Sequence, residues 1–285
     1  IRDRDLSLVQ VIDIVGDGDK TSRASAVYTA APRESFVIAL KDIPEVWEIQ
    51  YGDDPQPVYN GIMHDYRLQE GLAKQSGPFP VRRIRLEDHL DDFFFSQDYR
   101  LLFGASRSAG NGQVIQMDVG LKIADIPLAG LPHLGSGITW EWQGREILAT
   151  PHLGTGEVSI IDLESFEVLK RISTAGPGFF MRSHENSRYA WVDVFFGPNH
   201  DQIHVIDKQS LEIVKTLIPE PGKTAAHVEF DRYGRYALVS IWDQDGAVVV
   251  YDAGSLEEVK RLPMVKPSGK YNVYNKIYRS SGTSH

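Results

Sequence analysis

The chain has 285 residues, no cysteine and a formal net charge of −9, with 42% hydrophobic and 24% charged residues. This length accommodates one large domain or two smaller ones, with enough apolar side chains for a substantial core. The lack of cysteine excludes disulfides, thiolate metal sites and cysteine nucleophiles. The negative charge argues against nucleic acid or an anionic membrane surface as the main partner. No apolar run is long enough to cross a bilayer, so we expect no membrane span.

The first residues of the chain resemble the second half of a repeat that is complete further along. Residues 1–12 match the turn and strand with which each later repeat ends, and residues 35–40 and 46–51 form another strand pair. The chain begins within a repeat and on Ile rather than Met. This pattern predicts a domain that is incomplete at its N-terminus.

One interruption breaks the pattern between about residues 51 and 81. Two Pro-containing turns, at 53–57 and 77–80, bracket a polar stretch there. Loops of this size are often functional lids or interfaces. Since no Pro/Gly/Ser-rich linker divides the rest of the chain, residues 1–285 are predicted to form a single β-propeller domain with an insertion at about 51–81.

Four aspartates recur 44 or 45 residues apart, at Asp118, Asp162, Asp207 and Asp252. Upstream of the last three, a turn that carries arginine leads into a strand-like run, and a second such run ends on the aspartate. A repeat of this length, made of short β-branched and aromatic runs, is typical of propeller blades. The predicted fold class is therefore all-β, a β-propeller, with about five and a half blades in this chain.

Histidines set among glycines carry the clearest chemical signal. His133 and His152 lie in two Gly-containing turns, and the same point of the next two blades carries Arg182 or His184, and then His227. Glycine allows the backbone to approach a large flat ligand, and a neutral imidazole is a good axial ligand for haem iron. The alternative for each histidine is a structural hydrogen bond to a nearby carbonyl group.

Other motifs are weaker. His200 and His204 have the spacing of a helical metal site but fall on a turn and a strand, and Asp17-Gly18-Asp19 is followed by no bidentate acid at loop spacing. We therefore expect neither a zinc nor a calcium site. The run Phe93-Phe94-Phe95 is predicted to lie in a blade core.

Five segments together resemble a known family. Residues 132–137, 149–154, 180–184, 240–242 and 266–275 are similar to the d1-haem-binding propeller of the periplasmic haem-cd1 nitrite reductases and their paralogues. The resemblance implies a propeller with eight blades at full length, a role in denitrification and a periplasmic location, with the signal or anchor segment outside this chain. Residues 90–95 and 282–285 look most like the NirF group of haem d1 biosynthesis proteins. The NirN group of dihydro-haem d1 dehydrogenases is the close alternative.

The chain departs from the reductase pattern at its distal site. His133 matches one of the two distal histidines of the reductases, but Asp91 stands at the position of the other, with His89 two residues away. Ser136 replaces an arginine. The loss of an imidazole and a cation should weaken the binding of an anion, because charge-assisted hydrogen bonds are the stronger ones. Nitrite reduction is therefore not expected.

The resemblance implies a protein that binds haem d1 or a late tetrapyrrole precursor during cofactor maturation. It would either carry out an oxidoreductase step on the tetrapyrrole or hold and deliver it; a NirN-like dehydrogenase and a non-enzymatic interaction scaffold are the alternatives. His133 would be the distal iron ligand, and Arg182, Arg23 and Lys270 would pair with the tetrapyrrole carboxylates. The residues expected to contact the tetrapyrrole are His133, His152, Arg182, His184, His227, Arg23, Gly269, Lys270 and Tyr271.

The resemblance also implies protein partners. These are haem-cd1 nitrite reductase and NirN-like maturation proteins, and a homodimer is a further assembly to be tested.

Overall fold

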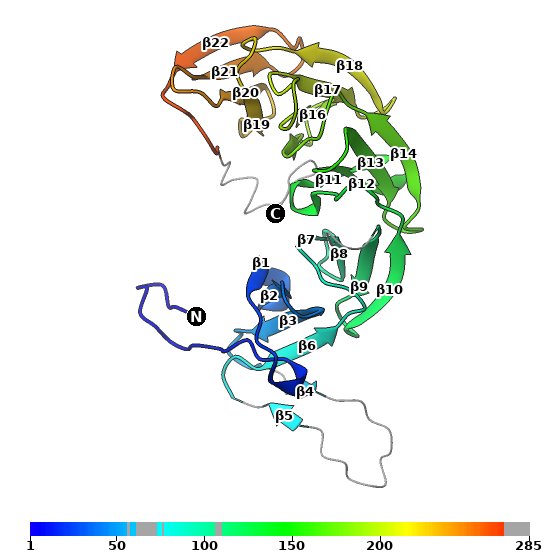
Figure 1. The fold of residues 1–285 in the computed structure, drawn as a ribbon, viewed down its shortest axis with the longest axis vertical. Helices are drawn as coiled ribbons and strands as arrows, with labels where there is room; N and C mark the ends of the chain where they lie inside the picture. The colour runs from blue at the N-terminus through cyan, green and yellow to red at the C-terminus, as the bar shows by residue number, and fades with distance from the viewer. Residues whose placement is uncertain (56–57, 61–72, 76, 106–109, 271–285) are drawn as a thin grey trace. The chain divides into compact units, whose positions relative to one another are not determined.

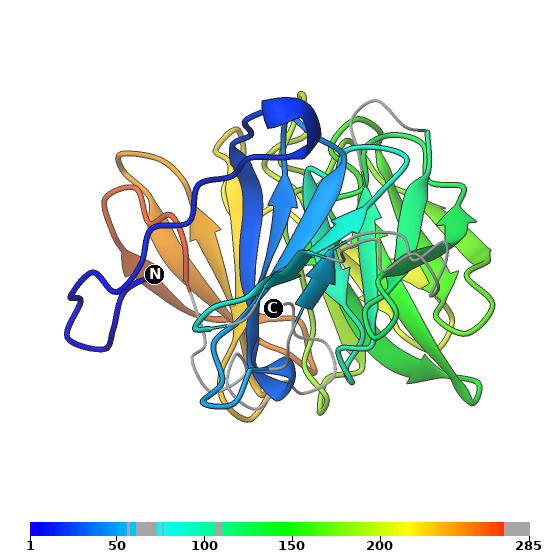
Figure 2. The same cartoon turned by 90° about the horizontal axis from the view of Figure 1, so that it is seen from below.

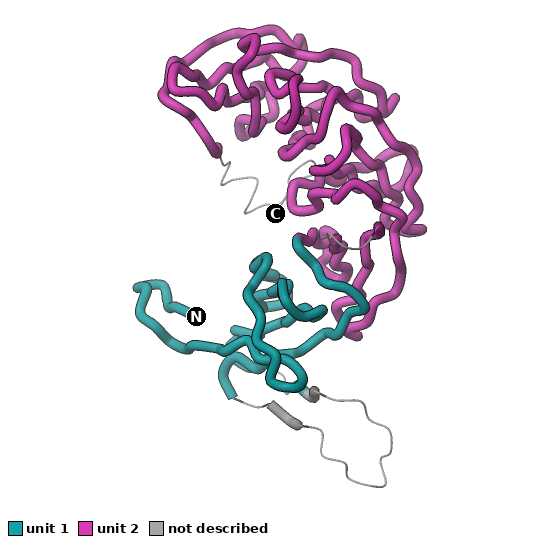
Figure 3. Tube along the Cα trace, viewed as in Figure 1, with its two compact units in different colours: residues 1–91 teal, residues 92–285 magenta. Residues whose placement is uncertain are grey.

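The computed structural model describes residues 1–55, 58–60, 73–75, 77–105 and 110–270. The chain divides into two compact units, residues 1–91 and residues 92–285, each described here by itself (Figure 3). The helices among the described residues are short 3-10 turns, and none of them could span a membrane.

Unit 1 holds one four-stranded antiparallel sheet, in the order β1-β2-β3-β6, and a two-stranded hairpin. The sheet strands are β1 (Ala24–Ala30), β2 (Ser35–Leu40), β3 (Glu45–Gln50) and β6 (Val81–Arg85); the hairpin strands are β4 (Val58–Asn60) and β5 (Ala73–Gln75); the 3-10 turns are η1 (Asp17–Asp19) and η2 (Ala31–Arg33). Leu40, Ile43, Trp47 and Ile49 form its core. β3 pairs directly with β6, so the segment predicted as an insertion connects two neighbouring strands of this sheet.

The N-terminal segment differs from its prediction. Residues 1–12 form no strand; they fold back on themselves through an isolated bridge between Arg2 and Leu8 and through hydrogen bonds such as that from the Val9 N–H to the Ile1 carbonyl oxygen. The apolar side chains of Leu6 and Val11 are 71% and 68% exposed. A segment with alternating apolar residues forms a strand only when a neighbouring strand pairs with its backbone N–H and C=O groups. The described part of unit 1 offers residues 1–12 no such neighbour.

Unit 2 consists of four successive antiparallel sheets of four strands each. The strands are β7 (Asp92–Phe95), β8 (Leu101–Ala105), β9 (Gly112–Gln116) and β10 (Leu121–Ile126); β11 (Ile138–Trp142), β12 (Arg145–Pro151), β13 (Glu157–Asp162) and β14 (Val168–Ser173); β15 (Met181–Arg182), β16 (Tyr189–Asp193), β17 (Ile203–Asp207) and β18 (Glu212–Leu217); and β19 (Ala225–Phe230), β20 (Tyr236–Ile241), β21 (Ala247–Asp252) and β22 (Glu258–Pro263), with the 3-10 turn η3 (Leu134–Ser136) before β11. In Figure 1 the last strand of each sheet, β10, β14, β18 or β22, lies on the outer side of unit 2. Figure 2 shows the twist of the sheets from another side.

Apolar side chains bind each sheet of unit 2 to the next. One cluster joins Trp191 and Val205 of one sheet to Phe230 and Val249 of the following one, and two further clusters join the remaining neighbours in the same way. Phe93, Phe94 and Phe95 are buried, as predicted. Four-stranded sheets that pack face to face in sequence order confirm the predicted all-β propeller architecture.

The recurring aspartates stabilise the turns between the third and fourth strands. One carboxylate oxygen of Asp162, Asp207 and Asp252 accepts the backbone N–H groups two and three residues later, at 2.8–3.1 Å. Such side-chain turns are the reason that aspartate is favoured at this point. Asp118 accepts a hydrogen bond from Arg100 at 3.0 Å, as Asp162 does from Arg145.

Glycines precede the arginines of the first-to-second-strand turns. Gly144 and Gly234 both have positive φ, of 78° and 70°. A Cβ atom at Gly144 would meet nothing within 4 Å, whereas one at Gly234 would lie 2.4 Å from Nδ1 of His184. The two turns therefore share a backbone requirement and differ in the space around them.

Replacing either glycine by alanine should destabilise the protein, but to different degrees. Gly144→Ala should cost about 1 kcal/mol through backbone strain alone, and Gly234→Ala should cost clearly more, because the buried imidazole of His184 must also move. Urea unfolding of both variants measures the difference. Equal losses of unfolding free energy would contradict the role assigned to His184 in packing this turn.

Candidate functional site

The chemical groups of interest gather at one end of the strands of unit 2. In an antiparallel sheet, the start of the first strand and the end of the second lie at the same end. His133 precedes β11, Phe180 precedes β15, Asp193 ends β16, and Ala225 begins β19. We call this end, made of residues 131–137, 176–180, 193–196 and 225–227, the imidazole end.

His133 is held in one orientation by the protein. Its Nδ1 lies 2.6 Å from the carbonyl oxygen of Phe179, and its ring lies 4.4 Å from the Phe179 ring. A carbonyl oxygen can only accept, so Nδ1 carries the proton and, in the neutral ring, Nε2 carries the lone pair. Nε2 lies 3.6 Å from a carboxylate oxygen of Asp92, which also accepts the N–H of Gly135.

The glycines beside His133 make room for protein atoms. A Cβ atom at Gly135 would lie 2.5 Å from the Asp92 carboxylate, and one at Gly137 would lie 2.8 Å from the carbonyl oxygen of Leu134. The sequence suggested that these glycines admit a ligand. The contacts show that they admit the Asp92 side chain and a tight 3-10 turn.

His227 is buried and has a φ of 54°, which is uncommon for a residue with a side chain. The pairing of β19 with β20 is irregular at this point, between Ala226 and Glu229. Lys270 binds both sides of the residue: its backbone N–H donates to Nδ1 of His227 at 3.2 Å, and its ammonium group donates to the His227 carbonyl oxygen at 2.5 Å and to Ser240 Oγ at 2.6 Å. Burial lowers the pKa of Lys270 to about 7.

Asp193 is fully buried at the end of β16. One of its oxygens accepts the N–H groups of Phe179 and Phe180 at 2.8 and 3.0 Å, and the other accepts the N–H of His227 at 3.2 Å. Burial raises the pKa of Asp193 to about 6, although these three hydrogen bonds oppose the rise. The sequence analysis missed this residue. An acid inside the apolar run 190–194 was the available signal, since a buried carboxylate requires partners.

Arg182 lies on β15 and is also nearly buried. Its Nε lies 3.6 Å from a carboxylate oxygen of Glu229 on β19. Glu229 and Asp193 both act electrostatically on Lys270. The structure thus brings Arg182, Lys270 and His227 together with two acids, Asp193 and Glu229, that the sequence analysis did not identify.

Aromatic side chains cover the imidazole end. Phe179 and Phe180 contact Phe195, with ring centroids 5.2 and 6.1 Å apart, and Phe195 contacts Trp242 at 5.2 Å. Phe180 also contacts the His227 ring at 4.5 Å, and Phe196 is 40% exposed. The indole N–H of Trp242 is enclosed and finds no acceptor among the residues that the structure describes. We call Phe179, Phe180, Phe195, Phe196 and Trp242 the aromatic cluster.

Two predicted contact residues lie inside the protein. His152 is completely buried, with Nε2 at 2.9 Å from Ser159 Oγ, and burial lowers its pKa. His184 lies in the turn after β15, at the opposite end of that strand from Phe180. Its Nε2 lies 3.2 Å from the Arg232 carbonyl oxygen, and its Nδ1 accepts the N–H of Asn186. Both rings therefore have structural hydrogen bonds.

The other residues predicted to contact the tetrapyrrole are Arg23, Gly269 and Tyr271. Arg23 belongs to unit 1, where its guanidinium group binds the carboxylate of Asp42 at 2.7 and 3.0 Å, and its side chain is 72% exposed. Gly269 is exposed, next to Lys270. Tyr271 lies outside the described residues.

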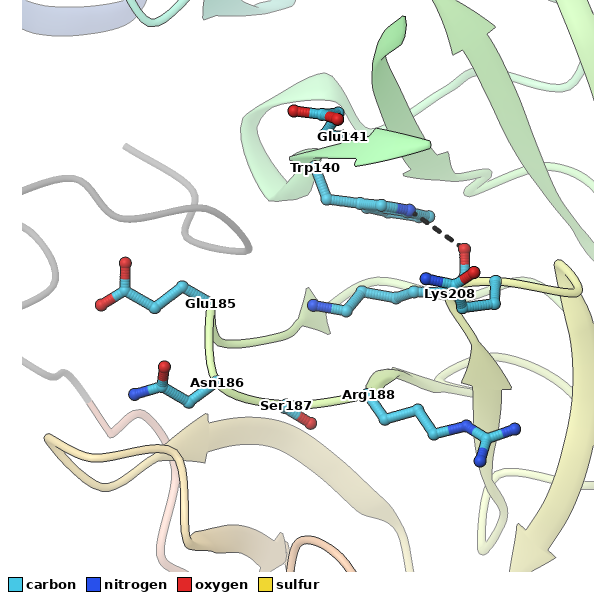
Figure 4. Close-up of a pocket in the computed structure, with 8 residues that line it drawn as sticks. Trp140, Glu141, Glu185, Asn186, Ser187, Arg188 and Lys208 are labelled. Carbon is cyan, nitrogen blue, oxygen red and sulfur yellow. Dashed lines mark hydrogen bonds between the residues drawn. The ribbon is translucent and has the colours of Figure 1, made fainter. Parts of the chain in front are cut away.

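A separate cavity of about 620 Å³ lies between the sheets β11–β14 and β15–β18 (Figure 4). The residues that line it include Trp140, Glu185, Arg188 and Lys208, and the Trp140 indole N–H donates to the Lys208 carbonyl oxygen at 3.3 Å. These residues come from the later part of β11 and from turns at the end of the strands opposite to the imidazole end. The cavity is therefore distinct from the histidine site.

The described residues contain no group of three or more His, Asp or Glu side chains placed to hold a metal ion. His200 and His204 illustrate this. Their Nδ1 atoms lie 3.0 and 2.8 Å from the hydroxyl groups of Thr224 and Thr216, respectively.

Comparison with known proteins identifies the family. The family profile described as Cytochrome D1 heme domain matches residues 1–76 and 72–276. The chain belongs to the cytochrome D1 heme domain family. Dihydro-heme d1 dehydrogenase of Pseudomonas aeruginosa is 56% identical over 282 residues, which are 99% of this chain and 53% of that protein. The solved structure described as dihydro-heme d1 dehydrogenase NirN in complex with DHE has a TM-score of 0.85 at 56% identity, covering 96% of this chain and 54% of that one.

Two NirF proteins and one further solved structure are more distantly similar to the chain. Protein NirF of Stutzerimonas stutzeri is 26% identical over 258 residues, 90% of this chain and 61% of that protein, and Protein NirF of Pseudomonas aeruginosa is 27% identical over 255 residues, 88% and 59%. A hydrazine synthase of Kuenenia stuttgartiensis shares the fold at 12% identity, with a TM-score of 0.60 over 90% of this chain and 70% of that one. The chain spans about half the length of the dehydrogenase that it matches.

These identities correct the expected subgroup. The sequence analysis favoured NirF, but the chain is 56% identical to the dehydrogenase and 26–27% identical to the two NirF proteins. The segments behind the earlier preference do not discriminate. Residues 92–95 form β7, whose phenylalanines are buried in the sheet packing common to such blades, and residues 282–285 lie outside the described residues.

The lowered pKa of Lys270 predicts a pH-dependent stability. Its folded pKa of about 7 lies below the ordinary lysine value of 10.5, so the unfolded chain binds the extra proton between these values. Unfolding free energy should therefore rise with pH in this window, by at most about 1.4 kcal/mol per pH unit. Urea unfolding at pH 7.5, 8.5 and 9.5 should show this slope in the wild type and a smaller one in Lys270→Met, where Lys208, whose pKa burial lowers to about 8, still contributes.

Lys223 provides the matched control. It forms a salt bridge with Asp245 that raises its pKa, so Lys223→Met should leave the slope between pH 7.5 and 9.5 unchanged. Parallel stability curves for the wild type and Lys270→Met would contradict the burial assigned to the Lys270 ammonium group.

Proposed function

We propose that this chain is the tetrapyrrole-binding part of a dihydro-haem d1 dehydrogenase, with dihydro-haem d1 as substrate and haem d1 as product. The observation that supports this most directly is the 56% identity to dihydro-heme d1 dehydrogenase over nearly the whole chain. The solved relative described as in complex with DHE supports the same class of ligand. The whole enzyme's activity is part of the proposal, because the chain spans about half of that relative.

The residues at the imidazole end fit a flat, anionic, iron-containing ligand. The aromatic cluster offers ring surfaces for a macrocycle, and the enclosed indole N–H of Trp242 requires an acceptor. His133 directs a lone pair at Nε2, the form in which imidazole binds iron. Lys270 and Arg182 supply cationic groups for carboxylates, which a buried site must pair.

The proposed reaction removes two protons and two electrons from a saturated side chain of the tetrapyrrole and converts a carbon–carbon single bond to a double bond. The electrons would pass singly to two equivalents of a one-electron acceptor of the ferric haem class, and the two protons would pass by way of the protein to solvent. Lys270 is suited to take up a proton, because a pKa near 7 leaves both its charged and neutral forms populated at neutral pH. Its bonds to Ser240 and to the His227 carbonyl hold the amine in place.

The distal surroundings of His133 favour this reaction over nitrite reduction. Asp92 places a carboxylate 3.6 Å from His133 Nε2. Ser136 is buried in η3, where its N–H donates to the His133 carbonyl oxygen. A negative group beside the distal imidazole repels an anionic substrate such as nitrite.

A role in haem d1 maturation would carry further consequences. A periplasmic location, contact with haem-cd1 nitrite reductase or other maturation proteins, and a homodimer are parts of the proposal, supported by the family membership alone. Each requires its own measurement in cells.

Removal of the His133 ring should change the bound tetrapyrrole. Titration of the chain with dihydro-haem d1 should give shifted absorption bands, and His133→Ala should weaken binding by about tenfold or more and alter the spectrum, because an axial ligand is lost. His184→Asn is the control. Its ring lies at the opposite end of β15, so this variant should lose stability but keep the spectrum and affinity.

An identical titration and spectrum for His133→Ala would remove His133 from the site. Unshifted bands with the wild-type chain would refute tetrapyrrole binding and favour the scaffold alternative.

Turnover distinguishes the dehydrogenase from a carrier. The chain, supplied with dihydro-haem d1 and ferric cytochrome c, should form a product that lacks two hydrogen atoms, detected by mass spectrometry. Lys270→Met should slow this conversion by about 100-fold, the usual effect of losing a proton-transfer group, whereas Lys223→Met should not. Tight binding without conversion, also when the electron acceptor is varied, would instead indicate a holding role.

A further inference from the structure

We propose that Asp193 is the positioning residue of the imidazole end: its carboxylate holds the backbone segments that orient His133 and His227, and it does so without touching the ligand. The inference rests on the proposed function for its binding readout, but its structural part can be tested in the unliganded chain.

The carboxylate of Asp193 connects two neighbouring sheets. Its donors are the backbone N–H groups of Phe179 and Phe180, which lead into β15, and of His227 on β19. Asp193 itself ends β16 and is 0% exposed. A single side chain therefore fixes the spacing between the entry to one sheet and the first strand of the next.

Each of these backbone segments orients one imidazole. Phe179 donates its N–H to Asp193 and, through its carbonyl oxygen, accepts the Nδ1–H of His133 at 2.6 Å. The Phe180 ring contacts the His227 ring at 4.5 Å, while His227 donates its own N–H to the same carboxylate. Asp193 thus acts on the His133 ring through Phe179, and on the His227 ring through the backbone of His227 itself.

The backbone at His227 requires this support. Its φ of 54° is costly for a residue with a side chain, and such conformations persist only when the surroundings hold them. Asp193 holds the N–H and Lys270 holds the carbonyl oxygen of this residue. Strain maintained by opposed charged groups is typical of a site in which the direction of a side chain matters.

An ionised acid is suited to this task because both oxygens accept and neither donates. Three N–H donors converge on Asp193. The nearby ammonium group of Lys270 favours the charged form. An asparagine of the same size would turn an NH₂ group toward at least one of these donors.

Asp207 offers a matched control within the same sheet. It is also buried, and it accepts two backbone N–H groups, from Gln209 and Ser210. It ends β17, at the end of the sheet opposite to the imidazole end, and its contacts stabilise a turn. Asp193→Asn and Asp207→Asn therefore remove the same charge and the same kind of acceptor from opposite ends of one sheet.

The test compares these two variants of the full chain by imidazole ¹⁵N NMR without ligand and by titration with dihydro-haem d1. In Asp193→Asn the ring signals of His133 and His227 should move toward a mixture of tautomers, and affinity should fall about tenfold or more, as when outer partners of a ligand group are lost. In Asp207→Asn the ring signals should stay in place and affinity should remain within about twofold, even where stability falls.

Unchanged ring signals in a folded Asp193→Asn would overturn the proposal, as would losses of affinity in the two variants that simply follow their losses of stability. If Asp193→Asn does not fold, Phe179→Ala replaces it. This variant keeps the Phe179 N–H for Asp193 and the Phe179 carbonyl oxygen for His133, so the His133 ring should keep its tautomer, and a mixture of tautomers would overturn the proposal. If the wild type binds no tetrapyrrole, the proposed function fails, while the NMR comparison still decides whether Asp193 positions the rings.

Discussion

The packing of each sheet on the next is the constraint from which the rest of unit 2 follows. Sheets that pack on a neighbour at either face leave apolar side chains along the strands, as in the cluster that joins Trp191 to Phe230. Polar and charged side chains then lie mainly at the ends of the strands. At one end, Asp162, Asp207 and Asp252 stabilise similar turns. At the other, the segments differ from sheet to sheet, and there the imidazoles gather.

The charged groups near His227 are an exception to this apolar rule. Arg182, Glu229, Lys270 and Asp193 are largely enclosed, and each is bonded or paired with another part of the chain. Removing two charges from water is costly, and apolar residues of similar volume would often serve stability equally well. These charged groups lie at the end of the strands that also carries the half-buried aromatic cluster, and under the proposed function they would meet a ligand with several acceptor groups.

The sequence could predict those features that repeat. A period of 44 or 45 residues revealed the blades, and the buried Phe93–Phe95 strand followed from its composition. The sequence predicted only part of the candidate site. His133, Arg182, His227 and Lys270 were predicted from motifs. The acids Asp193 and Glu229 were missed because each has a partner in another sheet, His227 for Asp193 and Arg182 for Glu229. No local pattern records such a contact.

The mistaken preference for NirF has the same physical origin. Phe93, Phe94 and Phe95 are buried, so a likeness at residues 90–95 reflects the packing of the sheet and not a reaction. Charged contacts lie instead at strand ends, such as the carboxylate of Asp92 at 3.6 Å from His133 Nε2. A carboxylate there changes the charge that a bound molecule meets, while it leaves the sheet beneath it unaltered. The charge beside the His133 ring is thus set by one side chain at the start of β7, and a carboxylate at that point disfavours an anion there whatever the packing of the sheet.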